Sequence, residues 1–152
     1  MTPDDLREEI HIELEFMEGT VNELVSLKHD LIERKPTSRE KAAAAVFLAD
    51  FYNGVENTLK RICRYHSISL PSGDTWHVDL FVRFCEPSYP SLPLLFDEQL
   101  RSELSYFRKF RHVVRHGYAF QLEWNRMRQG VENVEVVFSR FKQLLDEYLK
   151  TL

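Results

Sequence analysis

Basic side chains recur on one face of the stretch from Arg108 to His116. Arg108, Arg111, His112 and Arg115 are three or four residues apart, a spacing that places them on one side of a helix. Histidine can give and take a proton near neutral pH, and arginine offers a fixed charged fork to a phosphate. Cleavage of a phosphodiester without a metal needs a base, an acid and a stabiliser of growing negative charge. These residue types could supply all three.

Positive charge is concentrated around this basic strip. Residues 101–128 contain seven Lys and Arg against two acidic residues, a net charge of +5. The whole chain carries −4, so the other residues sum to −9. The overall balance argues against a nucleic-acid partner, whereas the local balance predicts an anion-binding site.

Arg111 interrupts an apolar stripe on the expected helix. The stripe is formed by Leu100, Leu104, Phe107, Val114 and Tyr118. A structural interpretation is that Arg111 keeps its charge at the edge of the core or pairs with a buried acid. In the functional interpretation it binds a phosphate. Arg111 and His116 are roughly 140° apart around an ideal helix. They converge only if the helix loosens near Gly117 or if both line a cleft shared with a second subunit.

Other kinds of site have less support in the sequence. His112 and His116 have a spacing that can hold zinc, but no cysteine or carboxylate lies nearby at a suitable spacing. We therefore predict no metal site. The five glycines are too scattered for a phosphate-binding loop, so no nucleotide cofactor is expected. The remaining histidines, at positions 11, 29, 66 and 77, are interpreted as surface or helix-end residues.

Apolar residues at steps of three and four predict an all-α fold. The expected helices run from residue 3 to about 35, from 38 to about 65, over 75–81, from 97 to about 117, and from about 125 to 149. They form one domain over residues 1–152, a bundle of four main helices and a short one. No apolar run has the length of a membrane span and no signal peptide is evident, so we expect a cytoplasmic protein without a membrane partner.

The phrase RHVVRHGY, residues 111–118, resembles the motif of the HEPN superfamily and of its HepT-like toxins. That motif is an arginine, four residues, a histidine, one residue and a tyrosine. The phrases at 51–57 and 74–77 also look like this family, whose second helix supplies a polar residue near the site. Glu56 is the first choice for that residue and Asn53 the second, although both could lie on a solvated helix face.

The resemblance implies a homodimer in which two motif-bearing helices flank a composite cleft. It also implies a metal-independent endoribonuclease acting on RNA. Carried over, Arg111 would bind the scissile phosphate and His116 would transfer protons. His112, at the variable polar position of the motif, would assist. We expect Arg115 and Arg108 of the basic strip, together with Glu56 and Asn53, to assist or to bind RNA.

Tyr118 matches the family tyrosine to which a nucleotidyltransferase antitoxin of the MNT type attaches AMP. The resemblance therefore implies the toxin of a toxin–antitoxin pair, with that antitoxin as partner. Two alternatives remain open. One is a non-catalytic interaction module that binds the nucleotidyltransferase, and the other is a zinc hydrolase that uses His112 and His116.

Overall fold

The protein is all-helical over the residues that its computed structural model describes, 1–117 and 123–152. This agrees with the predicted fold class. The helices are α1 (Pro3–Asp30), α2 (Ser38–Tyr65), α3 (Trp76–Val82), α4 (Glu98–His116) and α5 (Trp124–Leu149). Tyr118, the predicted modification site, lies outside the described residues.

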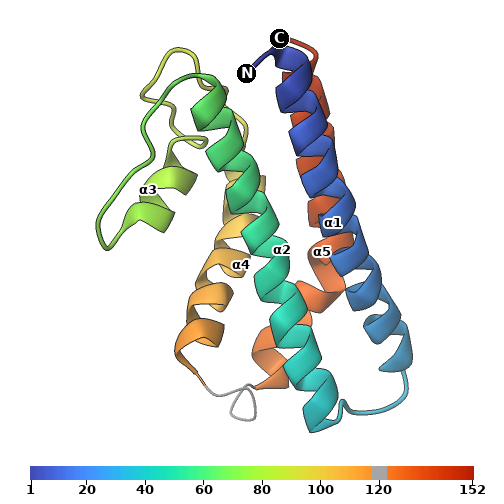
Figure 1. Cartoon of the computed structure of the whole chain (residues 1–152). Coiled ribbons are helices and arrows are strands. Elements are labelled where there is room, and N and C mark those ends of the chain that lie inside the picture. The colour runs from blue at the N-terminus through green and yellow to red at the C-terminus, as the bar shows by residue number, and fades with distance from the viewer. Residues whose placement is uncertain (118–122) are drawn as a thin grey trace.

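The four long helices run alternately down and up, with both chain termini at one end of the bundle (Figure 1). Helix α2 packs against all four other helices. The short α3 lies beside α2 on the side of α4 (Figure 1). Side chains on α2 therefore meet residues from both α3 and α4, and this arrangement creates the site.

The ends of the long helices follow local signals in the sequence. Thr37 and Glu40 form a reciprocal capping box at the start of α2, as predicted. Helix α1 ends at Asp30, about five residues before the predicted end. Ile32 beyond it is exposed, so no burial of apolar surface holds the helix past that point.

None of the helices described is long and apolar enough to cross a membrane.

Aromatic packing fixes α4 and α5 against α2. The Phe51 ring of α2 lies 4.9 Å from the Phe107 ring of α4 and 6.3 Å from the Phe138 ring of α5, measured between centroids. Gly130 of α5 allows a close approach to α4, because a Cβ at this position would lie 2.7 Å from Cε1 of Tyr106. This packing sets the face of α4 that is turned toward α2.

Candidate functional site

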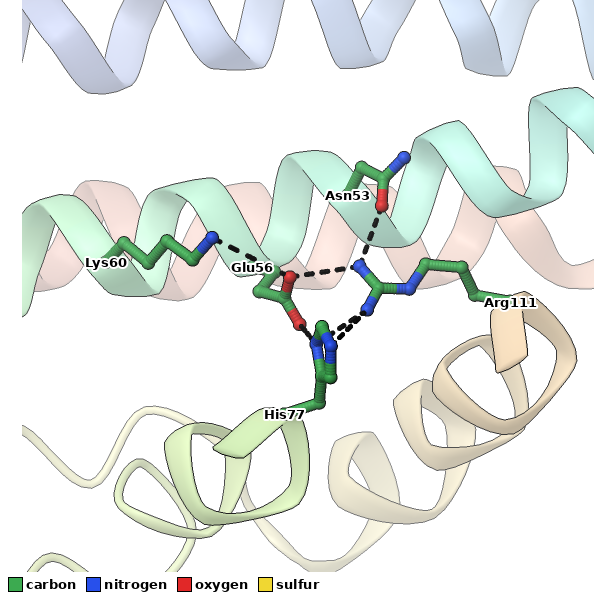
Figure 2. Close-up of polar contacts among 5 residues, drawn as sticks. All are labelled: Asn53, Glu56, Lys60, His77 and Arg111. Atoms are coloured by element: carbon green, nitrogen blue, oxygen red, sulfur yellow. Dashed lines mark hydrogen bonds and ion pairs between the residues drawn. The ribbon is translucent and has the colours of Figure 1, made fainter. Parts of the chain in front are cut away.

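The Arg111 side chain extends from α4 toward α2 and is only 4% exposed (Figure 2). Its Nη1 donates hydrogen bonds to Asn53 Oδ1 at 2.7 Å and to Glu56 Oε1 at 2.9 Å. Its Nη2 lies 2.6 Å from Nδ1 of His77 on α3. One guanidinium thus links three helices, which explains how an arginine can occupy the apolar stripe.

Glu56 is the buried acid that pairs with Arg111. The residue is 4% exposed, so its interpretation as part of a solvated face is wrong. Its Oε2 lies 2.6 Å from His77 Nδ1, and Lys60 Nζ lies 4.0 Å from its Oε1. A buried carboxylate is tolerated only with such partners, because its desolvation is otherwise very unfavourable. The structural interpretation of Arg111, pairing with a buried acid, is therefore correct.

The aromatic ring of Tyr52 packs against the guanidinium of Arg111. The Arg111 guanidinium lies 5.4 Å from the centroid of the Tyr52 ring, within the range of a cation–π interaction. Burial raises the pKa of the Tyr52 hydroxyl, which has no hydrogen-bond partner among the described residues. The phenol therefore stays neutral, so it places no negative charge beside Arg111.

A pocket of about 710 Å³ opens between the segment 73–78 and helix α4. Six residues of the predicted strip and its neighbours border it: Arg108, Lys109, Arg111, His112, Arg115 and His116. His112, Arg115 and His116 are exposed and Arg108 is half-buried. The His112 and His116 rings lie 4.5 Å apart between centroids. The structure thus gathers the basic residues of the motif around one pocket.

Arg111 and His116 border the same pocket but differ in exposure. Helix α4 stays regular to His116, so it does not loosen before Gly117 to bring the two together. Arg111 is directed into the bundle, whereas His116 is exposed. Convergence of the two side chains in a cleft shared with a second subunit stays a prediction.

His77 is the site residue that sequence reasoning missed. The sequence predicts a surface or helix-end histidine at this position, whereas His77 contacts both Glu56 and Arg111. Position 77 is the second residue of a seven-residue helix, too short for a periodic pattern to assign its inner face. The one signal was the resemblance of the phrase 74–77 to the family.

The described residues contain no group of three or more His, Cys, Asp or Glu side chains arranged to hold a metal ion. Among these residues, His112 and His116 lie side by side without a third side chain that could complete a metal site.

A family model of HepT-like proteins matches residues 43–152, which include every candidate site residue. No curated protein and no solved structure matches the chain. The match covers more than half of the sequence and agrees with the resemblance of the motif to the HEPN superfamily of toxins and ribonucleases. The chain therefore belongs to the HepT-like family.

Proposed function

We propose that this protein is a metal-independent endoribonuclease, the toxin of a toxin–antitoxin pair. One observation carries the proposal: Arg108, Arg111, His112, Arg115 and His116 all border one open pocket. Membership of the HepT-like family supports the same chemistry. The phosphate backbone of RNA is attracted by the arginines of this cluster even though the whole chain is acidic.

The proposed reaction is attack of a 2′-hydroxyl on the neighbouring phosphorus. A histidine removes the 2′-hydroxyl proton as the 2′-oxygen bonds to phosphorus. The bond from phosphorus to the 5′-oxygen breaks, and that oxygen takes a proton from a second acid. The products are a 2′,3′-cyclic phosphate and a 5′-hydroxyl. His116 is exposed at the pocket and would carry one of the two protons.

The second proton carrier would be His112, whose ring lies 4.5 Å from that of His116, or a histidine of a second copy of the chain. A dimer that joins two such pockets would place Arg111 and His116 of both copies around one cleft. Exposed Val78 and Val113 border the pocket and favour contact with a second copy. A protein that stays monomeric at micromolar concentration would argue against this composite site.

Cleavage in the presence of EDTA tests the proposed chemistry. The purified protein is expected to cut an RNA oligonucleotide and to leave 2′,3′-cyclic phosphate ends. The same sequence made with 2′-deoxy residues should stay intact, because it has no nucleophile. Cleavage that requires added zinc, or that also degrades the deoxy oligonucleotide, would contradict the proposal.

Neutralisation by an MNT-type nucleotidyltransferase is the second part of the proposal. Transfer of AMP to Tyr118 would place a negative charge two residues from His116 and repel RNA. Mass spectrometry after co-expression with such a partner is expected to find one added AMP on the peptide that contains Tyr118. An unmodified peptide beside a neutralised toxin would instead indicate that the partner covers the site.

A non-catalytic interaction module is the alternative, and the burial of Arg111 favours it. An arginine held by Asn53, Glu56 and His77 stabilises the fold whether or not any RNA binds. Induced expression without a partner separates the two functions, because a module causes no growth arrest.

A further inference from the structure

A second pocket, of about 680 Å³, lies at the end of the bundle opposite the chain termini (Figure 1). It opens where α1 ends and where α2 and α5 begin, between residues 28–41 and 124–132. Among the described residues, none borders both this pocket and the Arg111 pocket between the segment 73–78 and α4. The two pockets are therefore separate sites.

Positive charge prevails around the second pocket. The cationic side chains that border it are Lys28, Arg34, Lys35, Lys41 and Arg128, and we call it the lysine pocket. Among the described residues that border it, Glu132 is the one acid. No salt bridge to any of the three lysines occurs in the part of the chain that the structure describes. Their three ammonium charges therefore attract an anion into the pocket.

The two arginines pair with acids beside the pocket. Arg34 donates to both carboxylate oxygens of Glu40 at 2.7 Å and so ties the loop before α2 to the first turn of that helix. Arg128 Nε lies 2.9 Å from Glu132 Oε1, and Lys28 Nζ lies 3.5 Å from the backbone oxygen of Glu132. The carboxylates offset the charges of the arginines, so the net attraction for an anion comes from the lysines.

Trp124, the first residue of α5, adds an aromatic ring to the lysine pocket. Its side chain is half-buried and packs against the core, whereas Ile32 beside the same pocket is exposed. Cations beside an aromatic ring are typical of sites for single-stranded nucleic acid, because the cations bind the phosphates while a base stacks on the ring. A base in a duplex is already stacked and paired, so this arrangement favours unpaired nucleotides.

We propose that the lysine pocket binds an unpaired stretch of RNA, with its phosphates at the lysines and a base stacked on Trp124. This inference rests on the proposed function, because the bound strand is the one that is cleaved at the Arg111 pocket. The segment 117–123 separates His116, at the Arg111 pocket, from Trp124. Helix α4 ends and α5 begins at the same end of the bundle (Figure 1). A strand that passes this end of the bundle therefore meets both pockets.

Contacts away from the scissile phosphate bind substrate and transition state equally, so they lower KM and leave kcat unchanged. The joint substitution Lys35→Gln, Lys41→Gln is expected to raise KM for a long unpaired RNA by about tenfold at low salt. A dinucleoside monophosphate has one phosphate and occupies one pocket at a time, so kcat/KM for its cleavage should stay unchanged. Lys142→Gln is the matched control, since Lys142 is exposed on α5 and does not border the lysine pocket.

Stacking on Trp124 is tested by binding of a 2′-O-methyl oligoribonucleotide, which cannot be cleaved. Trp124→Leu is expected to weaken binding by about fivefold or more, and Trp124→Phe should keep most of the affinity because it retains an aromatic ring. Equal binding by the two variants would overturn the proposed stacking.

Fluorine NMR observes the two pockets separately, because the chain has two tryptophans and each borders one pocket, Trp76 the Arg111 pocket and Trp124 the lysine pocket. Both are labelled as 5-fluorotryptophan, and Trp124→Phe assigns the signals. The 2′-O-methyl oligoribonucleotide is expected to shift both signals. An abasic strand with the same phosphates should shift the Trp124 signal less, because it has no base to stack.

The outcomes distinguish this inference from the proposed function. A Trp124 signal that does not move, in a protein whose cleavage of long RNA is unaffected by the lysine substitutions, would overturn the inference and leave the proposed function standing. A Trp124 signal that moves with RNA, in a protein that cleaves none, would reject the proposed function and support the RNA-binding pocket.

Discussion

Replacing Arg111 by alanine is expected to lower the free energy of unfolding by about 3 kcal/mol, in addition to its effect on cleavage. The substitution removes the permanently charged donor at Oε1 of the buried Glu56 carboxylate, and only His77 at Oε2 and Lys60, 4.0 Å from Oε1, remain beside it. For a domain of this size, the midpoint of thermal unfolding should fall by about 6–12 °C. Urea or thermal unfolding followed by circular dichroism measures the change.

Arg115 provides the matched control on the same helix. It lies one turn after Arg111 but is exposed, and no salt bridge to it occurs among the described residues. Arg115→Ala should change the free energy of unfolding by about 0.5 kcal/mol or less. Equal effects of the two substitutions would mean that the buried ion pair does not stabilise the fold.

Glu56→Gln tests the source of the Arg111 effect. If an unpaired carboxylate causes the instability, Arg111→Ala should be less harmful when Glu56 is already neutral. The double variant should then be more stable than the sum of the single changes predicts, by about 0.5–3 kcal/mol. Additive effects would indicate loss of packing instead of a stranded charge.

This structural role changes how loss of activity is interpreted. A cell that tolerates Arg111→Ala could do so because the variant is partly unfolded and removed. The same ambiguity applies to Glu56, which is equally buried. An informative test of catalysis needs a residue at the pocket whose removal leaves the bundle intact.

The sequence predicted the fold well because burial follows a helical period along most of this chain. The apolar stripe of α4 also revealed Arg111 as an exception, since a charge at a buried position requires a special reason. The choice of Glu56 over Asn53 came from the family resemblance, and both turn out to bind Arg111. Their contacts join residues more than fifty positions apart, a distance that no local pattern spans.

His77 and the end of α1 show where sequence patterns lose their power. A seven-residue helix has too few turns for its inner face to be assigned. The role of His77 depends on how α3 is placed beside α2 and α4, which is a matter of tertiary packing. At the end of α1, Leu31 continues the apolar pattern but already lies beyond the last helical residue, so the pattern extends further than the helix.

His116→Ala is expected to reduce kcat/KM for RNA cleavage in EDTA by about 10²- to 10⁴-fold. His116 is exposed at the pocket and lies at the last turn of α4, so its removal breaks no buried contact. The free energy of unfolding should change by about 0.5 kcal/mol or less. Cleavage assays and unfolding curves on the same preparation separate the two effects.

His11→Ala is the control, since His11 is an exposed histidine on α1 that does not border the pocket. It should leave both cleavage and stability unchanged.

In cells, growth arrest should follow expression of the wild type and of His11→Ala and disappear with His116→Ala. Equal residual cleavage by wild type and His116→Ala would mean that a contaminant cuts the RNA. Without growth arrest by the wild type, the interaction module becomes the better account, and the buried contacts of Arg111 serve the fold alone.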